Sequence, residues 1–254
     1  MPYRYFAAVL LCSLPFWLAG AFLGGLPLPV DLPVSALMAF VPGIVALVFV
    51  WRADGRHAAW AFARRIADGA RVQRVRWYVA AFSFMPAVMA LSYVLMRMLD
   101  MALPEPDFEV VALPILFAMF LIAGLGEELG WQGYAYEKFG AGWSAFGAAL
   151  MLGLFWTLWH IIPYFQTGHD GSWVIWHCGV TVLLRVATVW VYVNGGRSVF
   201  CAALFHAMSN VSFFLFPNGG SHYAPEVTFW VLAAASAGLL FLWGPGTLAR
   251  FRYR

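Results

Sequence analysis

Long apolar segments recur along the whole chain, separated by mostly short polar connections. A membrane-crossing helix needs about 20 mostly apolar residues. Eight stretches meet this requirement: 6–24, 32–51, 77–99, 110–130, 143–163, 173–193, 198–216 and 225–243. The pattern predicts an all-α polytopic membrane protein with about eight transmembrane helices. Since no polar linker divides the series, we expect residues 1–254 to form a single membrane domain.

The composition agrees with this class. Of the 254 residues, 63% are hydrophobic and 11% are charged, whereas soluble domains carry about 25% charged residues. The three cysteines, Cys12, Cys178 and Cys201, all lie in apolar runs, where a cysteine is usually a small packing residue rather than half of a disulfide. We expect membrane lipid as the surrounding partner and no nucleic-acid partner, and the sequence carries no signal for an oligomeric state.

The longest connection is strongly basic. Residues 52–76 contain seven arginines against Asp54 and Asp68. Apolar residues recur between the charges at near-helical spacing, which is compatible with an amphipathic helix on an anionic leaflet. A solvated loop that sets the topology explains the charges equally well.

The arginines also predict the orientation of the chain. The positive-inside rule assigns residues 52–76 to the cytoplasm, and eight spans then put both termini there. Arg4 agrees, and so do Arg250, Arg252 and Arg254, while the acidic residues of 100–109 fall on the opposite side. In an alternative interpretation, residues 19–21 (Ala-Gly-Ala) are a signal-peptide cleavage site. The arginine pattern favours an uncleaved first helix.

Ionisable side chains are few inside the predicted spans, where each costs about 2.5–3.5 kcal/mol. They are Glu127, Glu128, His160, His177, Arg185 and His206, joined by the polar Asn210. Adjacent helical residues point about 100° apart, so one glutamate could face a catalytic water while the other makes a structural bond. Like charges this close also resist joint ionisation. The alternative is a glutamate pair that is simply solvated at the membrane surface.

The remaining polar residues are compatible with a site that stabilises an oxyanion. His206 and Asn210 are four residues apart and share a helical face, so both could donate hydrogen bonds to an oxyanion. His160 precedes Pro163, which can open the helix there. Glutamate and histidine are also zinc ligands, but the sequence contains no HExxH motif and no GxSxG motif. We therefore expect no metal, no cofactor and no serine nucleophile.

Three short motifs resemble those of the CPBP family of intramembrane proteases, which includes the type II CAAX prenyl endopeptidases. They are EELGWQGY (127–134), WHIIP (159–163) and HAMSN (206–210). Each motif alone is weak, but all three occur in the family's order within a core of about 110–216. The resemblance implies a glutamic endopeptidase that works inside the membrane.

The resemblance also implies roles for individual residues. Glu127 would activate a water molecule with help from His160. His206 and Asn210 would stabilise the tetrahedral oxyanion, and Glu128 would orient or tune the site. The substrate would be a membrane-associated peptide or a prenylated protein.

Two positions depart from the family pattern. Gln132 stands where the family has an arginine, and Trp156 stands where it usually has a phenylalanine. Gln132 is four residues from Glu128 and could donate a hydrogen bond to it, but it supplies no positive charge. Our hypothesis is that Arg185, deep in the sixth span, supplies this cation to one of the glutamates. The alternative is that Arg185 reaches the membrane surface or bonds backbone carbonyls.

One geometric difficulty follows from the predicted boundaries. Glu127 would lie near the cytoplasmic end of its span and His160 near the far end of the next, so straight helices would keep them apart. Helix tilt, a long fourth helix that runs past Tyr136, or helix boundaries that differ from the predicted ones could bring them together. Four glycines would allow close helix approach in this region: Gly124, Gly126, Gly130 and Gly133.

Two other functions remain open from the sequence. One is a non-catalytic membrane protein that binds a peptide or confers bacteriocin self-immunity, which the loss of the family arginine at Gln132 favours slightly. The other is a small transporter that uses glutamate and histidine as a proton relay. The chain lacks an evident internal repeat, which disfavours the transporter.

Overall fold

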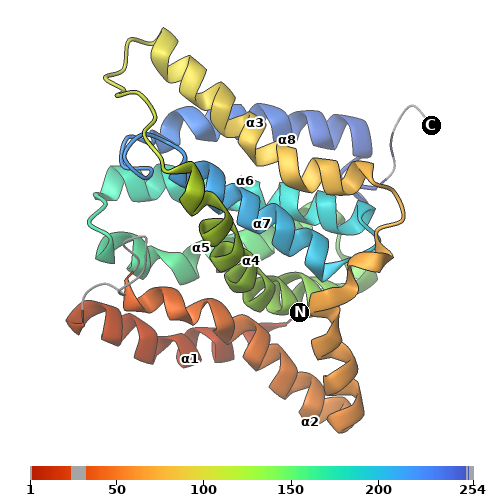
Figure 1. The fold of residues 1–254 in the computed structure, drawn as a ribbon. Helices are drawn as coiled ribbons and strands as arrows, with labels where there is room; N and C mark the ends of the chain where they lie inside the picture. The colour runs from red at the N-terminus through yellow and green to blue at the C-terminus, as the bar shows by residue number, and fades with distance from the viewer. Residues whose placement is uncertain (1, 24–32, 250, 252–254) are drawn as a thin grey trace.

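The computed structural model describes residues 2–23, 33–249 and 251, which form a bundle of helices (Figure 1). The described chain has eight α-helices: α1 (Tyr3–Phe22), α2 (Val41–Ala63), α3 (Arg76–Met98), α4 (Leu113–Gly130), α5 (Ala145–Gln166), α6 (Gly171–Asn194), α7 (Val199–Phe214) and α8 (Pro225–Trp243). Seven helical segments are long and apolar enough to cross a membrane, and α7 is apolar but shorter, at 16 residues. The predicted all-α polytopic membrane fold is confirmed.

The predicted spans match the helices to within a few residues, except at two places. Residues 24 and 32, where the first span ends and the second begins, lie outside the described residues, as do Arg250, Arg252 and Arg254. The helix α2 continues well past the predicted end at residue 51. Charge does not end a helix, so α2 runs on beyond its apolar part and bends at Gly55, whose φ of 82° favours glycine.

The connections gather at the two ends of the bundle. In Figure 1 the α3–α4, α5–α6 and α7–α8 connections lie together at the left, and the α2–α3 connection lies at the right. The arginine-rich residues 52–76 therefore lie at one end of the bundle. The α5–α6 and α7–α8 connections lie at the other.

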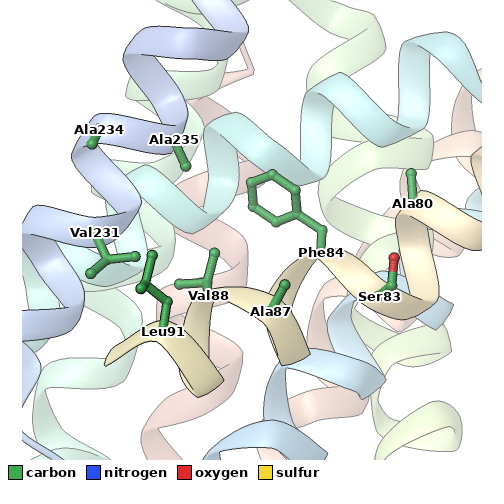
Figure 2. A pocket seen from close by; sticks show the side chains of 9 residues that line it. All are labelled: Ala80, Ser83, Phe84, Ala87, Val88, Leu91, Val231, Ala234 and Ala235. Carbon is green, nitrogen blue, oxygen red and sulfur yellow. The ribbon is translucent and has the colours of Figure 1, made fainter. Parts of the chain in front are cut away.

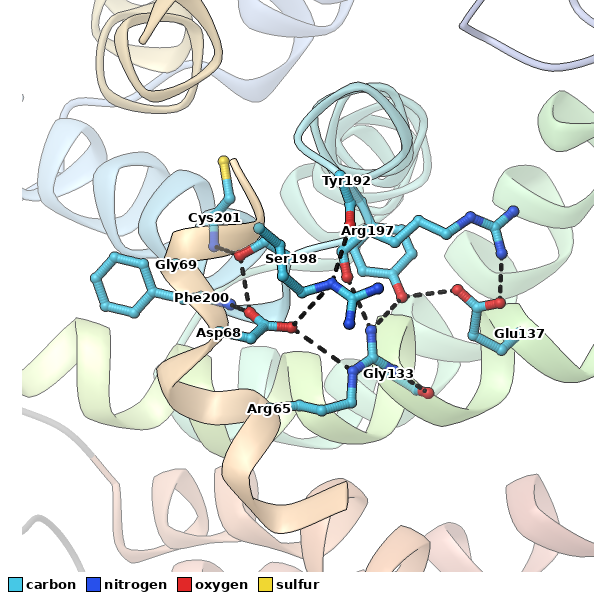
Figure 3. A network of polar contacts seen from close by, with 12 residues as sticks. Arg65, Asp68, Gly69, Gly133, Glu137, Tyr192, Arg197, Ser198, Phe200 and Cys201 are labelled. Carbon is cyan, nitrogen blue, oxygen red and sulfur yellow. Dashed lines mark hydrogen bonds and ion pairs between the residues drawn. The ribbon is translucent and has the colours of Figure 1, made fainter. Parts of the chain in front are cut away.

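The last part of the basic segment binds the protein itself. After α2 the chain forms a 3₁₀-helical stretch, Arg64–Arg71. Arg65 donates hydrogen bonds to the Gly133 carbonyl (2.9 Å) and to the Tyr192 hydroxyl (2.8 Å) (Figure 3). The interpretation of residues 52–76 as a simply solvated loop is therefore wrong for this stretch. The leaflet-bound amphipathic helix stays a prediction for the exposed residues before it.

Asp68 joins this stretch to the start of α7. Its Oδ1 accepts hydrogen bonds from the Ser198 hydroxyl (2.8 Å) and from the Phe200 N–H (3.1 Å) (Figure 3). Ser198 in turn caps α7 by accepting the Cys201 N–H at 3.1 Å. Because the first N–H groups of a helix have no partner within it, Asp68 and Ser198 together satisfy the N-terminus of α7.

Close backbone approach holds α4 in the middle of the bundle. It packs against α7 and against α2. A Cβ added to Gly43 of α2 would lie 2.5 Å from the Gly126 carbonyl oxygen, and one added to Gly124 would lie 3.1 Å from the Ala203 carbonyl oxygen. The glycines of α4 thus allow the close contacts that the sequence predicted.

Between α3 and α8, small side chains leave a groove of about 510 Å³ (Figure 2). Ala80, Ala87, Ala234 and Ala235 form much of its lining. The hydroxyl of the one polar lining residue, Ser83, already donates to the Val79 carbonyl at 2.7 Å. The groove therefore presents no unsatisfied polar side chain that would orient a polar ligand.

We predict that Asp68→Ala destabilises the protein by about 1–2 kcal/mol, because it removes the acceptor for the first turn of α7. For a chain of this size that corresponds to a loss of roughly 2–8 °C in Tm, measured by thermal unfolding in detergent micelles. The matched control is Asp107→Asn, at an exposed aspartate in the α3–α4 connection, which should leave Tm unchanged. Equal melting of wild type and Asp68→Ala would contradict the capping role.

Candidate functional site

The helix that carries the two glutamates does not stop at its predicted end. After Gly130 the chain continues as a π-helical turn, Trp131–Ala135, and then as a 3₁₀ turn, Tyr136–Lys138. Glu127 and Glu128 therefore lie inside a continuous helical segment, and both side chains are buried. This continuation resolves the geometric difficulty that straight, shorter spans implied.

The two glutamates point to different partners. Glu127 Oε2 accepts a hydrogen bond from Trp156 Nε1 at 2.7 Å and a longer one from Trp131 Nε1 at 3.3 Å. Both carboxylate oxygens of Glu128 accept from Arg185 Nη1, at 2.9 Å and 2.7 Å. The adjacent residues thus divide as their 100° separation predicts: one carries the ion pair, and the other is held by neutral donors.

His206 lies between the two carboxylates. Its Nδ1 is 2.8 Å from Glu128 Oε1, and its Nε2 is 4.0 Å from Glu127 Oε1. Since the guanidinium of Arg185 stabilises Glu128 as an acceptor-only carboxylate, Nδ1 of His206 carries the hydrogen in this bond. That bond fixes the ring and directs Nε2 toward Glu127.

His160 and Asn210 reach the same place from α5 and α7. His160 Nδ1 lies 2.9 Å from the Trp156 carbonyl oxygen, so it donates there and leaves Nε2 for other partners. One cavity of about 910 Å³ is lined by four of the predicted catalytic residues: Glu127, His160, His206 and Asn210. Glu128, the fifth, lies behind the cavity wall with Arg185.

Gln132 does not form the hydrogen bond to Glu128 that the sequence suggested. It is fully buried, but neither its side-chain oxygen nor its nitrogen has a hydrogen-bond partner within the described chain. The expected bond to Glu128 is therefore wrong. The physical reason is the π turn, which begins at Trp131 and takes Gln132 out of the α-helical i, i+4 register with Glu128.

Arg185 instead forms the ion pair suggested for it. The side chains of Arg185 and Glu128 are both 0% exposed, and Arg185 Nη1 lies 2.7 Å from Glu128 Oε2. The alternative in which Arg185 reaches the membrane surface is wrong. The guanidinium also lies 4.0 Å from the centroid of the Trp156 ring, a cation–π contact that is strong where water is excluded.

Trp156 is the residue whose importance the sequence did not reveal. Its indole N–H holds Glu127, its face covers Arg185, and its ring packs edge-on against His160 and His206, with centroids 5.1 Å and 5.4 Å away. A phenylalanine, the usual residue at this position of the motif, has no N–H to donate. The feature of the sequence that could have pointed to Trp156 is its position four residues before His160, on the same face of the helix.

Within the part of the chain that the structure describes, no three histidine, cysteine or acidic side chains are grouped so that they could hold a metal ion.

Comparison with known proteins identifies the motif-bearing segment. Residues 109–212 match the family described as type II CAAX prenyl endopeptidase Rce1-like. This segment is similar to that family. The chain is also 25% identical over 231 residues to CAAX prenyl protease 2 of Methanococcus maripaludis, a match that covers 83% of each protein.

The Rce1-like segment contains all five predicted catalytic residues and both tuning residues, Gln132 and Arg185. The resemblance stated from the motifs is confirmed, and so is the predicted class of the protein, an integral membrane peptidase of the CAAX-protease type.

We predict that Arg185→Met destabilises the protein by about 3–5 kcal/mol, because it leaves Glu128 buried without its cation. The double variant Arg185→Met/Glu128→Gln removes both charges and should regain much of that loss. Thermal unfolding of wild type, both single variants and the double variant completes a double-mutant cycle. Strictly additive losses would show that the ion pair has no coupling energy.

Proposed function

We propose that this chain, acting as one membrane domain, hydrolyses a peptide bond of a membrane-associated or prenylated peptide. The observation that carries the proposal is the convergence of Glu127, His160, His206 and Asn210 from three helices on one cavity. Ion pairing withdraws Glu128 from that cavity and leaves Glu127 as its carboxylate.

Glu127 acts as the general base. Both hydrogen bonds that its carboxylate accepts from the described residues go to Oε2, which leaves Oε1 available to a water molecule. Glu127 takes a proton as the water oxygen bonds to the substrate carbonyl carbon. The proton then passes to the leaving amine, with His160 assisting, as the C–N bond breaks.

His206 and Asn210 stabilise the oxyanion. They share one face of α7, and both line the cavity. Because Nδ1 of His206 donates to Glu128, His206 donates to the oxyanion from Nε2, as the doubly protonated imidazolium. Each donor to a developing oxyanion contributes about 3–4 kcal/mol to transition-state stabilisation. Glu128 positions His206 through the 2.8 Å bond to its Nδ1, so it acts on the reaction through another side chain.

Arg185 tunes the site from behind the cavity wall. It supplies the positive charge that Gln132 lacks, and the Glu128 carboxylate that it binds accepts the hydrogen bond from His206. In this chain the cation beside Glu128 thus comes from α6 and not from the glutamate-bearing helix. This arrangement supports activity in spite of the altered motif.

The cavity supports a peptide-sized, largely apolar substrate. Its volume of about 910 Å³ lies in the upper part of the usual range for ligand sites. The archaeal relative is named a CAAX prenyl protease, and on that basis we propose a prenylated or otherwise lipid-associated peptide for this chain. The alternative, a non-catalytic peptide-binding or self-immunity protein, would use the same cavity but would not hydrolyse its ligand.

The decisive variant is Glu127→Gln. It keeps the hydrogen-bonding shape of the side chain but removes the base, so we expect hydrolysis to fall by about 10²–10⁴-fold with an unchanged Tm. The assay follows an internally quenched, S-farnesylated C-a-a-X peptide in detergent micelles. The control is Glu105→Gln, at a glutamate that is 81% exposed, and it should retain full activity. Wild-type protein that binds this peptide without cleaving it would favour the non-catalytic alternative.

We also propose that both termini lie in the cytoplasm. The arginines of residues 52–76 support this orientation. In that orientation the cavity extends toward the non-cytoplasmic face, because its lining includes Thr167 and His169 after α5 and residues 218–221 after α7.

Cysteine labelling tests this orientation. In a background without Cys12, Cys178 and Cys201, we expect Ser221→Cys to react with a membrane-impermeant maleimide added to intact cells. His57→Cys, at an exposed position of the basic segment, should react only after the membrane is permeabilised. The reverse pattern would overturn the orientation and leave the fold unaffected.

A further inference from the structure

Beyond His160 the cavity ends in a cluster of aromatic side chains. This aromatic box consists of Tyr164, Trp173, His177, Phe213 and Tyr223, all of which line the cavity. His177 is its centre: the ring stacks on Trp173 with centroids 4.4 Å apart, meets Tyr164 edge-on at 4.8 Å and meets Tyr223 edge-on at 5.6 Å. The box is built from α5, α6, α7 and the α7–α8 connection.

His177 is the one member of the box with an unused buried ring nitrogen. Its Nδ1 is shielded from solvent and has no hydrogen-bond partner within the described residues. The Tyr164 hydroxyl, by contrast, already pairs with the Thr181 hydroxyl at 3.2 Å. A buried polar atom without a partner is unfavourable. The His177 side chain is only partly buried, so a turn of its ring can bring this nitrogen to an occupant that supplies a hydrogen bond.

We propose that the aromatic box binds the part of the substrate that leaves after cleavage, the peptide segment on the C-terminal side of the scissile bond. An apolar side chain of that segment packs against the rings, and His177 hydrogen-bonds a polar group of its backbone or its terminal carboxylate. The inference rests on the proposed peptidase function and makes His177 a specificity-determining residue.

The chemistry of His177 favours peptide over lipid as the occupant. An isoprenoid chain would fill the box but would leave the imidazole nitrogen without a partner. A peptide carries a donor or acceptor at every residue and can satisfy the nitrogen while its side chain contacts the aromatic rings.

The spacing along the cavity agrees with a short leaving segment. One ring, Tyr164, separates His160 from His177, stacking on the first at 5.6 Å and meeting the second at 4.8 Å. The two distances set an upper limit on the separation of the His160 and His177 rings, which is about three extended residues at roughly 3.3–3.6 Å each. A peptide bond held beside His160 would therefore place a residue at most about three positions further on at His177.

Binding to the inactive Glu127→Gln protein tests the proposal without requiring turnover. Two probes are compared by fluorescence competition in detergent: an S-farnesylated C-a-a-X tetrapeptide with a free carboxyl end, and S-farnesyl cysteine methyl ester, which lacks the leaving segment. We expect His177→Phe, which keeps an aromatic ring but loses the hydrogen bond, to weaken tetrapeptide binding roughly 5- to 30-fold. Binding of the methyl ester should stay unchanged and so report an intact fold.

His177→Asn is the second variant, because its amide can replace a ring nitrogen as a hydrogen-bonding group; it should recover most of the tetrapeptide affinity. His57→Phe, at the opposite end of the bundle, is the matched control and should bind both probes normally. Unchanged tetrapeptide affinity in His177→Phe would overturn the inference. Equal weakening of both probes would do the same, because it would assign the box to the lipid.

These outcomes remain separate from the test of the proposed function. If the wild-type protein fails to hydrolyse the tetrapeptide but His177→Phe selectively weakens its binding, the peptidase proposal fails and the box remains a peptide site. If hydrolysis occurs, the same variant in the active protein should raise KM and leave kcat nearly unchanged, since the contact is made equally in the ground state and the transition state.

Discussion

The buried ion pair between Arg185 and Glu128 is the interaction on which the rest of the site depends. Two charges removed from water are tolerated only when they are closely paired, and here both oxygens of Glu128 receive the same guanidinium nitrogen. The pair joins α4 to α6. Through the bond from Glu128 to His206 it also fixes α7, so one interaction sets the relative positions of three helices.

Aromatic side chains then give this polar cluster its shape. Trp156 covers Arg185, holds Glu127 and packs against two histidines. Aromatic residues continue along the cavity to the box around His177. The hydrolysis that we propose for this site needs water at one carboxylate and exclusion of water elsewhere, since electrostatic interactions strengthen in a dry surrounding. The division between Glu127 in the cavity and Glu128 behind it meets both needs.

Much of the fold could be predicted from the sequence, because a chain segment inside a membrane can adopt few backbone structures. Every backbone polar group must be satisfied within its own segment, so each apolar run of sufficient length is a helix, and eight were found near their predicted positions. The divergence of Glu127 and Glu128 was equally predictable, because it follows from helical geometry alone. The prediction missed the course of α2 beyond residue 51 and the π and 3₁₀ turns that continue α4 beyond residue 130. Apolar length limits a span but does not limit a helix.

The sequence by itself therefore determined the class of the fold, the candidate site residues and the need for a cation beside the glutamates. The tertiary structure decided which groups meet. A π turn at Trp131 removed Gln132 from Glu128, and packing of α6 supplied Arg185 from 57 residues away. The packing of the helices also places Trp156 and His177 in the lining of one cavity. Periodicity fixes the direction of a side chain within its own helix, but contacts between helices depend on how the helices pack, which no local pattern encodes.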